Sequence, residues 1–175
     1  MNQQSGFLIG IGSNIEPHHN LVAIIDQLLE HFPKITLSRV LLLPPIGMNS
    51  PHDFLNVVAF IETTISEDKL KDMCNTIEMK LGRDRSDPTR KTKDRPADLD
   101  ILCAAQFPKD SERAAHTITD EYFLYPLLEE IAAYISGKHI SLEQEGVALM
   151  SMNLAFGQTA TTIYRQTDTR NKRII

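Results

Sequence analysis

Residues 54–64 read FLNVVAFIETT, and this stretch decides the fold. It is short, rich in branched and aromatic residues, and apolar on both of the faces that a strand would present. Such a run is typical of a strand that is covered on both sides. We therefore place residues 54–64 near the centre of a β-sheet.

The segments on either side complete one pattern. The expected elements, in chain order, are a strand at residues 7–11, a helix at 21–32, strands at 35–43 and 54–64, a helix at 66–82, a strand at 97–104 and a helix at 126–137. Ser66 is a good helix N-cap, Pro33 ends the first helix, and Gly82 and Gly137 are suitable C-terminal stops. The order predicts an α+β fold, a ferredoxin-like split βαβ sandwich with a mostly antiparallel sheet and helices packed on it.

The end of the chain has a weaker pattern. Residues 141–144 read SLEQ, which fits a capping box at the start of a helix. Residues 159–175 fit either an added strand or a mobile tail. We expect residues 1–140 to form one domain and residues 141–175 to be a C-terminal extension packed on it.

Composition excludes several classes of protein. The 175 residues are 42% hydrophobic and 23% charged, as in a globular domain, and the net charge of -5 argues against a general nucleic-acid-binding protein. No stretch is long and apolar enough for a membrane span, and the first residues lack a signal-peptide pattern, so the expected location is the cytoplasm. Cys74 and Cys103 are predicted to be buried, reduced thiols. The sequence leaves the oligomeric state open.

The most specific chemical signal is Asp98-Leu99-Asp100. Residues two apart on a strand point to the same face, about 6.5–7 Å apart. Two carboxylates in that arrangement suit magnesium, which takes one or two carboxylates together with phosphate oxygens and water. Taken alone, the motif also fits an edge strand with a solvated polar face.

A local excess of positive charge lies just upstream of these aspartates. Seven residues between positions 80 and 95 are basic and three are acidic. The basic ones are Lys80, Arg83, Arg85, Arg90, Lys91, Lys93 and Arg95. Arginine grips phosphate through two parallel hydrogen bonds, so this loop beside two metal-binding carboxylates suits a polyphosphate. Without the aspartates, a solvated charged loop would explain it equally well.

Several ordered motifs between about residues 6 and 135 resemble the hydroxymethyl-dihydropterin pyrophosphokinases. These motifs are Ile11-Gly12-Ser13-Asn14, Pro44-Pro45-Ile46-Gly47, Phe54-Leu55-Asn56, Ile77-Glu78, Gly82-Arg83-Asp84-Arg85, Arg95-Pro96-Ala97-Asp98-Leu99-Asp100-Ile101 and Tyr122-Phe123-Leu124-Tyr125-Pro126-Leu127. Family members transfer pyrophosphate from MgATP to 6-hydroxymethyl-7,8-dihydropterin and release AMP. The turn Gly12-Ser13-Asn14 alone is weak, because it is also a simple link between a strand and a helix.

The resemblance implies a role for each matching residue. Asp98 and Asp100 would hold two Mg²⁺ ions, and ATP would be the co-substrate. Arg83, Arg95 and His116 would be catalytic, and Glu78, Arg85 and Lys93 would bind the nucleotide. Phe54 and Tyr122 would clamp the pterin ring, whose polar edge would meet Asn56 and the segment of Leu43, Pro44 and Ile46. Core packing is the alternative for the two aromatic residues.

The chain also departs from the family pattern. The family usually carries R-W-G-P-R before the aspartates, whereas this chain has no tryptophan and reads RKTKDR at residues 90–95. Ala115 precedes His116 where the family has proline, and Asp120 stands where the pattern has arginine. We therefore predict a folate-pathway pyrophosphokinase of reduced speed. The alternative is an inactive homologue that binds a pterin or nucleotide as a sensor or partner.

Overall fold

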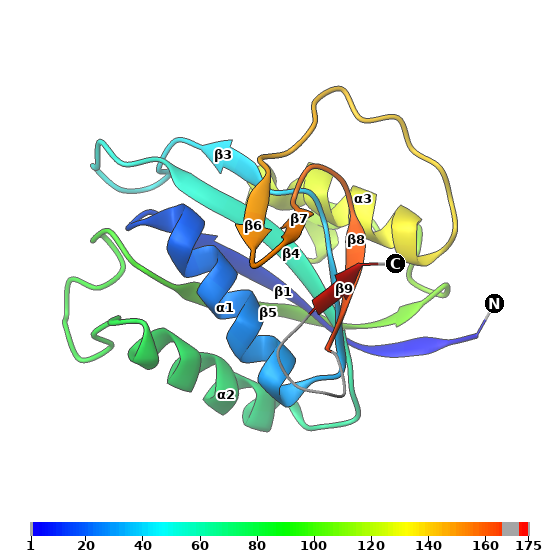
Figure 1. Ribbon diagram of the computed structural model, residues 1–175, viewed down its shortest axis with the longest axis horizontal. Coiled ribbons are helices and arrows are strands. Elements are labelled where there is room, and N and C mark those ends of the chain that lie inside the picture. Colours follow the sequence, from blue (N-terminus) through cyan, green and yellow to red (C-terminus); the bar gives the residue numbers. More distant parts are fainter. Residues whose placement is uncertain (1, 166–171, 175) are drawn as a thin grey trace.

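The computed structural model describes residues 2–165 and 172–174 and is built around one antiparallel sheet (Figure 1). The strands run in the order β5-β1-β4-β2-β8-β9, and β3 pairs with β4 beside this path. Their bounds are β1 (Gln4–Ser13), β2 (Lys34–Leu37), β3 (Leu41–Leu43), β4 (Phe54–Glu62), β5 (Asp98–Phe107), β8 (Thr161–Arg165) and β9 (Lys172–Ile174). The sequence prediction of a mostly antiparallel α+β fold with a central strand at residues 54–64 is confirmed.

Helices cover both faces of the sheet. In Figure 1, α1 (Pro17–His31) and α2 (Glu67–Lys80) lie on one face, and α3 (Tyr125–Ile135) lies on the other. Alternation along β1 builds two apolar clusters, because Ile9 and Ile11 point towards α1 and α2 while Leu8 points towards α3. Among the described residues, no helix is long and apolar enough to cross a membrane.

The predicted helix ends have the expected local causes. The Ser66 hydroxyl accepts a hydrogen bond of 3.2 Å from the backbone N–H of Lys69, which caps α2. Gly82 and Gly137 follow α2 and α3 with φ of 99° and 71°, values that favour glycine. These capping and terminating residues explain why the ends of α2 and α3 could be predicted closely from the sequence.

The predicted single strand at residues 35–43 is wrong, because it is divided into β2 and β3. Between β2 and β3, two backbone N–H groups donate to partners outside the sheet. The N–H of Arg39 donates to Glu130 on α3 over 2.8 Å, and the N–H of Val40 donates to the carbonyl of Gly157 over 2.8 Å. The sheet ladder cannot use these donors, so the strand is interrupted at residues 38–40.

Glu130 is a buried junction between α3, the interrupted strand and the C-terminal segment. One of its oxygens accepts from the Arg39 backbone and lies 3.5 Å from that residue's guanidinium, and the other accepts from the Ala160 N–H over 3.2 Å. Both charged side chains are almost fully buried. The pair therefore joins three segments that are distant in sequence.

Glu130→Gln is expected to destabilise the protein by about 1.5–3 kcal/mol, because a neutral amide replaces a buried carboxylate that serves three donors. The melting temperature should fall by roughly 3–12 °C. Glu129→Gln, on the exposed side of the same helix turn, is the matched control. Equal melting temperatures for the two variants would contradict a structural role for Glu130.

A bulge in β5 changes which face its side chains meet. Leu8 pairs with Cys103 and Ile9 pairs with Ile101, so Leu102 has no partner on β1. The alternation shifts there, and Cys103 packs on the α3 side while Ile101 packs on the side of α1 and α2. The prediction that Cys103 is buried was wrong, since it is half-buried, whereas Cys74 is buried as predicted; both are free thiols.

The C-terminal region forms short strands and lacks the helix that residues 141–144 suggested. Residues 141–144 form no helix, so the predicted capping box is wrong. A hairpin of β6 (Leu149–Ser151) and β7 (Leu154–Phe156) packs against α1, and β8 joins the main sheet beside β2. The added strand expected within residues 159–175 is therefore present, although residues 166–171 and 175 lie outside the described residues. Because of these pairings, we propose that residues 141–175 extend the same domain.

Candidate active site

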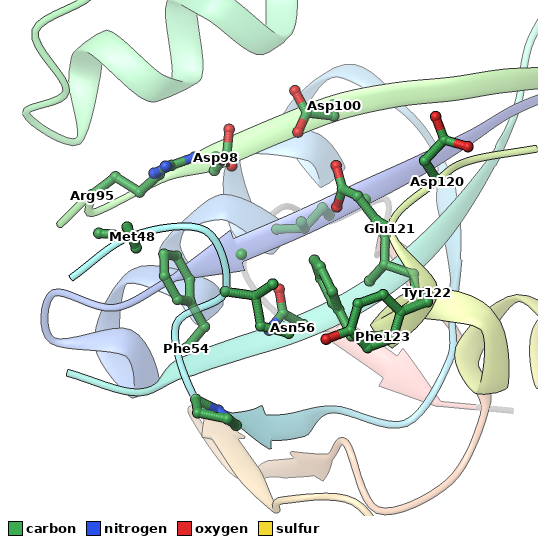
Figure 2. A pocket seen from close by; sticks show the side chains of 16 residues that line it. Met48, Phe54, Asn56, Arg95, Asp98, Asp100, Asp120, Glu121, Tyr122 and Phe123 are labelled. Carbon is green, nitrogen blue, oxygen red and sulfur yellow. Dashed lines mark hydrogen bonds and ion pairs between the residues drawn. The ribbon is translucent and has the colours of Figure 1, made fainter. Parts of the chain in front are cut away.

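A cavity of about 360 Å³ opens between β5, β1 and β4 on the α3 side of the sheet. Figure 2 shows its two chemically different sides, with Asp98 and Asp100 on β5, Asp120 and Glu121 on a facing segment, and aromatic rings below them. Its lining comprises Gly10, Ile11, Gly12, Pro44, Ile46, Met48, Phe54, Asn56, Arg95, Asp98, Asp100, Asp120, Glu121, Tyr122, Phe123 and Leu124. Its volume lies at the lower end of the usual range for small-molecule pockets, about 300–1,000 Å³.

Gly12, the second-to-last residue of β1, stands where a side chain would crowd the cavity. A Cβ placed there would lie 3.0 Å from the Asn56 amide oxygen and 3.5 Å from the Phe54 ring. A side chain there would crowd the Asn56 amide and contact the Phe54 ring, and both of these groups line this part of the cavity. The glycine of the motif Gly12-Ser13-Asn14, a weak signal in the sequence alone, therefore leaves space beside Asn56 and Phe54.

Three carboxylates face one another on the polar side of the cavity. Asp98 and Asp100 project from the same face of β5, as their spacing predicts, and Glu121 reaches towards them from the opposite wall (Figure 2). Desolvation in the cavity, together with the charges of Asp98 and Glu121, raises the pKa of Asp100 from 3.8 to about 6. Desolvation and the charge of Asp98 likewise raise the pKa of Glu121. This side therefore favours the binding of positive charge.

Two arginines partly neutralise this cluster through Asp98. Arg83 donates to one Asp98 oxygen over 2.7 Å, and Arg95 donates to the other over 2.8 Å. The guanidinium of Arg95 also lies 5.7 Å from the centre of the Phe54 ring. Arg95 thus touches both the carboxylate side and the aromatic side of the cavity.

Glu78 supports the arginines from behind the strand. It is fully buried and accepts hydrogen bonds from the Leu99 N–H over 2.9 Å, from Arg83 over 3.1 Å and from Arg85. A carboxylate with these donors fixes the end of α2 to the start of β5. These contacts orient the two arginines, and the predicted role of Glu78 at the nucleotide stays a prediction.

The structure gathers eight of the fourteen predicted site residues around the cavity. Pro44, Ile46, Phe54, Asn56, Arg95, Asp98, Asp100 and Tyr122 line it. The other six, Leu43, Glu78, Arg83, Arg85, Lys93 and His116, do not line it. His116 is exposed, and the Lys93 ammonium pairs with Asp87.

Sequence reasoning assigned no site role to six lining residues, Gly10, Ile11, Met48, Glu121, Phe123 and Leu124. Phe123 and Glu121 are the neighbours of a predicted residue, Tyr122; Phe123 belongs to the 3-10 helix Tyr122–Leu124, and Glu121 directly precedes it. No spacing rule marks Met48, which comes from an irregular loop. Only proximity to Tyr122 could have signalled Glu121.

The fold and the site together define a small enzyme domain that places an aromatic pocket beside paired carboxylates. Residues 8–132 match the family model of 7,8-dihydro-6-hydroxymethylpterin-pyrophosphokinase. The chain belongs to this family.

Named relatives agree with this placement. A 2-amino-4-hydroxy-6-hydroxymethyldihydropteridine pyrophosphokinase of Porphyromonas gingivalis is 33% identical over 103 residues, covering 58% of this chain and 70% of the relative. A protein of the same name from Haemophilus influenzae is 33% identical over 129 residues, covering 69% and 78%. Another from Bacillus subtilis is 29% identical over 149 residues, covering 79% and 86%.

Proposed function

We propose that this protein transfers the pyrophosphoryl group of ATP to 6-hydroxymethyl-7,8-dihydropterin and releases AMP, a step of folate biosynthesis. The observation that carries this function is the division of one cavity into two halves. One half offers aromatic faces and an amide, which suit a flat heterocycle, and the other offers paired carboxylates, which suit a metal-bound polyphosphate. The reacting hydroxyl and the transferred phosphate would meet where the two halves join.

Asp98 and Asp100 are the residues that would hold Mg²⁺, with two ions as the proposed number. Among the described residues, no group of three or more His, Cys, Asp or Glu side chains could hold a metal. Two carboxylates fit magnesium nonetheless, because it takes its remaining ligands from phosphate and water. Desolvation and the neighbouring negative charges raise the pKa of Asp100, and a bound cation would stabilise its charged form. Bound Mg²⁺ would neutralise charge between the β- and γ-phosphates.

Basic side chains would stabilise the charge that develops during transfer. Arg95 and Arg83 already lie at Asp98, so their guanidinium groups are held beside the position proposed for the phosphates. Arg85, Lys93 and His116 lie farther from the cavity and would contact the nucleotide at its edge. The chain's main contribution is to orient two substrates and to present positive charge, since phosphoryl transfer needs little covalent chemistry from protein.

The pterin would lie between Phe54 and Tyr122, with its polar edge towards Asn56 and the segment of Leu43, Pro44 and Ile46. Tyr122 is 63% exposed, which is unusual for a large aromatic side chain that serves only core packing. A bound heterocycle would cover it. This exposure favours the clamp over the packing explanation that the sequence left open.

Tyr122→Ala is expected to weaken pterin binding by about 1–3 kcal/mol, by analogy with the stacking of bases on aromatic side chains. ATP affinity measured alone should be unchanged. Phe54→Ala should act in the same direction, with an additional loss of the contact between Arg95 and the ring. Tyr134→Ala on α3, outside the cavity, is the control. Equal weakening of both ligands would instead show that the clamp residues support the core.

The reaction itself is tested by incubating the protein with MgATP and 6-hydroxymethyl-7,8-dihydropterin and measuring AMP. Release of AMP that depends on the pterin supports the proposed function. Release of ADP would contradict it, since that product indicates transfer of one phosphate. Binding of both ligands without AMP would favour the inactive homologue.

A further inference from the structure

Asp94 joins three loops that approach the cavity from different parts of the chain. One carboxylate oxygen accepts from the Asn14 amide over 2.8 Å and from the Ser50 hydroxyl over 2.5 Å. The other lies 2.5 Å from Nδ1 of His52. These partners are 80, 44 and 42 residues away in sequence. The hydrogen bonds from Ser50 and His52 hold the pKa of Asp94 below its usual value, so the carboxylate is ionised near neutral pH.

Asn14, which directly follows β1, bonds to both Asp94 and Arg95 and so belongs to the same network. Its side-chain oxygen accepts from the backbone N–H of Arg95 over 2.7 Å, and its backbone N–H donates to the Arg95 carbonyl over 3.1 Å. Its amide nitrogen donates to the carbonyl of His52 over 3.3 Å as well as to Asp94. Asn14 is only 4% exposed, so these bonds are shielded from water. The Arg95 backbone is thereby fixed to β1.

The two segments joined by Asp94 both supply lining residues of the cavity. Residues 44–53 contribute Pro44, Ile46 and Met48 to its wall, and they also contain Ser50 and His52. The adjacent Arg95 is the only basic side chain among the lining residues. A change in the position of Asp94 would therefore alter the wall and the cation together.

The residue types Ser50, His52 and Asp94 also invite comparison with a nucleophilic triad, but the geometry excludes that role. In a triad the serine hydroxyl bonds to the histidine, which abstracts its proton. Here the Ser50 hydroxyl donates to Asp94 instead, and neither Ser50 nor His52 lines the cavity. The cluster is a link between loops.

We propose that Asp94 is a positioning residue that holds Arg95 and residues 44–53 as one unit, so that the pterin side of the cavity is formed before substrate binds. The catalytic readout of this proposal rests on the proposed function, whereas the link itself does not. Preformed sites bind more tightly because less chain must be ordered on binding. Misplacement of a group by about 1 Å can cost about 10²-fold in rate.

Asp94→Ala is expected to lower kcat/KM for the pterin by about 10- to 100-fold while ATP affinity measured alone changes little. Asp94→Asn should restore most of the loss, because its amide oxygen can still accept from Ser50 and its NH₂ can donate to neutral His52. The matched control is Asp84→Ala in the same loop, since the hydrogen bonds of that carboxylate to described residues stay within the loop, at Ser86 and the backbone of Asp87. An equal loss in the control, or no restoration by asparagine, would overturn the proposal.

Substitution of the residues that bond to Asp94 gives an independent check. The double variant Ser50→Ala/His52→Ala should reproduce most of the Asp94→Ala loss, and combining all three substitutions should add little to it. Fully additive losses would show that Asp94 acts separately from the two residues.

Hydrogen exchange without ligands separates failure of the link from failure of the proposed function. In Asp94→Ala, the amides of Arg95 and His52 should exchange faster than in the parent, and in Asp84→Ala they should not. If the parent releases no AMP, the pyrophosphokinase assignment fails, while the exchange result still tests the link. Unchanged exchange at both amides in Asp94→Ala would overturn the positioning role.

Discussion

Asp100→Asn is expected to lower kcat/KM for MgATP by about 10³-fold, equivalent to about 4 kcal/mol of lost transition-state stabilisation. The proposed metal-binding carboxylate would become a neutral amide, which is a much weaker magnesium ligand. Nucleotide binding that depends on Mg²⁺ should be lost with it. Steady-state AMP release and titration of MgATP binding measure the two effects, and normal MgATP binding by the variant would rule out the ligand role.

The same substitution is expected to raise the melting temperature of the ligand-free protein at pH 7.5. Because Asp100 has a pKa of about 6 in the folded chain, above its ordinary 3.8, its charged form is disfavoured by folding. The loss of stability caused by ionised Asp100 is complete above about pH 6, and it disappears as the pH falls below 3.8, the ordinary pKa of the group. The advantage of Asp100→Asn over the parent should therefore shrink between pH 7.5 and pH 4.5.

Asp98→Asn provides the contrast. It should also impair magnesium-dependent binding, but it should lower the melting temperature, since Asp98 accepts from both Arg83 and Arg95. Opposite shifts in stability with a shared loss of activity would separate the metal-binding role from general damage to the fold. Equal destabilisation by both variants would contradict this account.

Asp120→Arg is expected to raise the steady-state rate of AMP release by about 10²–10³-fold, the usual value of one well-placed transition-state donor. Asp120 lines a cavity that holds four carboxylates and one guanidinium, so it adds negative charge where phosphates would bind. The parent should accordingly turn over more slowly than a relative with the complete arginine pattern.

Asp120→Asn controls for removal of the charge alone and should give a smaller gain than arginine. Arg90, Lys93 and Arg113 lie outside the lining, but loop movement could bring one of them to the phosphates. An unchanged rate in Asp120→Arg, with a parent as fast as the full-pattern relative, would show that such a residue already replaces the missing group.

Local signals in the sequence were sufficient for the order of the main elements and for part of the site. Residues 54–64 are apolar on both faces, and burial of such a strand requires neighbours on each side, which makes it central. Ser66 and Gly82 mark the ends of α2 through bonds and backbone angles that depend on nearby residues alone. The shared face of Asp98 and Asp100 follows from the two-residue period of a strand.

Tertiary structure decided the features that depend on partners far along the chain. The interruption at residues 38–40 arises because Glu130 and Gly157 take backbone donors from the sheet, and the bulge at Leu102 appears only when β5 pairs with β1. Glu121 joined the carboxylates and Asp94 joined Asn14 because folding brought their segments together. Periodicity reports which face a side chain occupies, whereas packing between distant segments determines what that side chain meets.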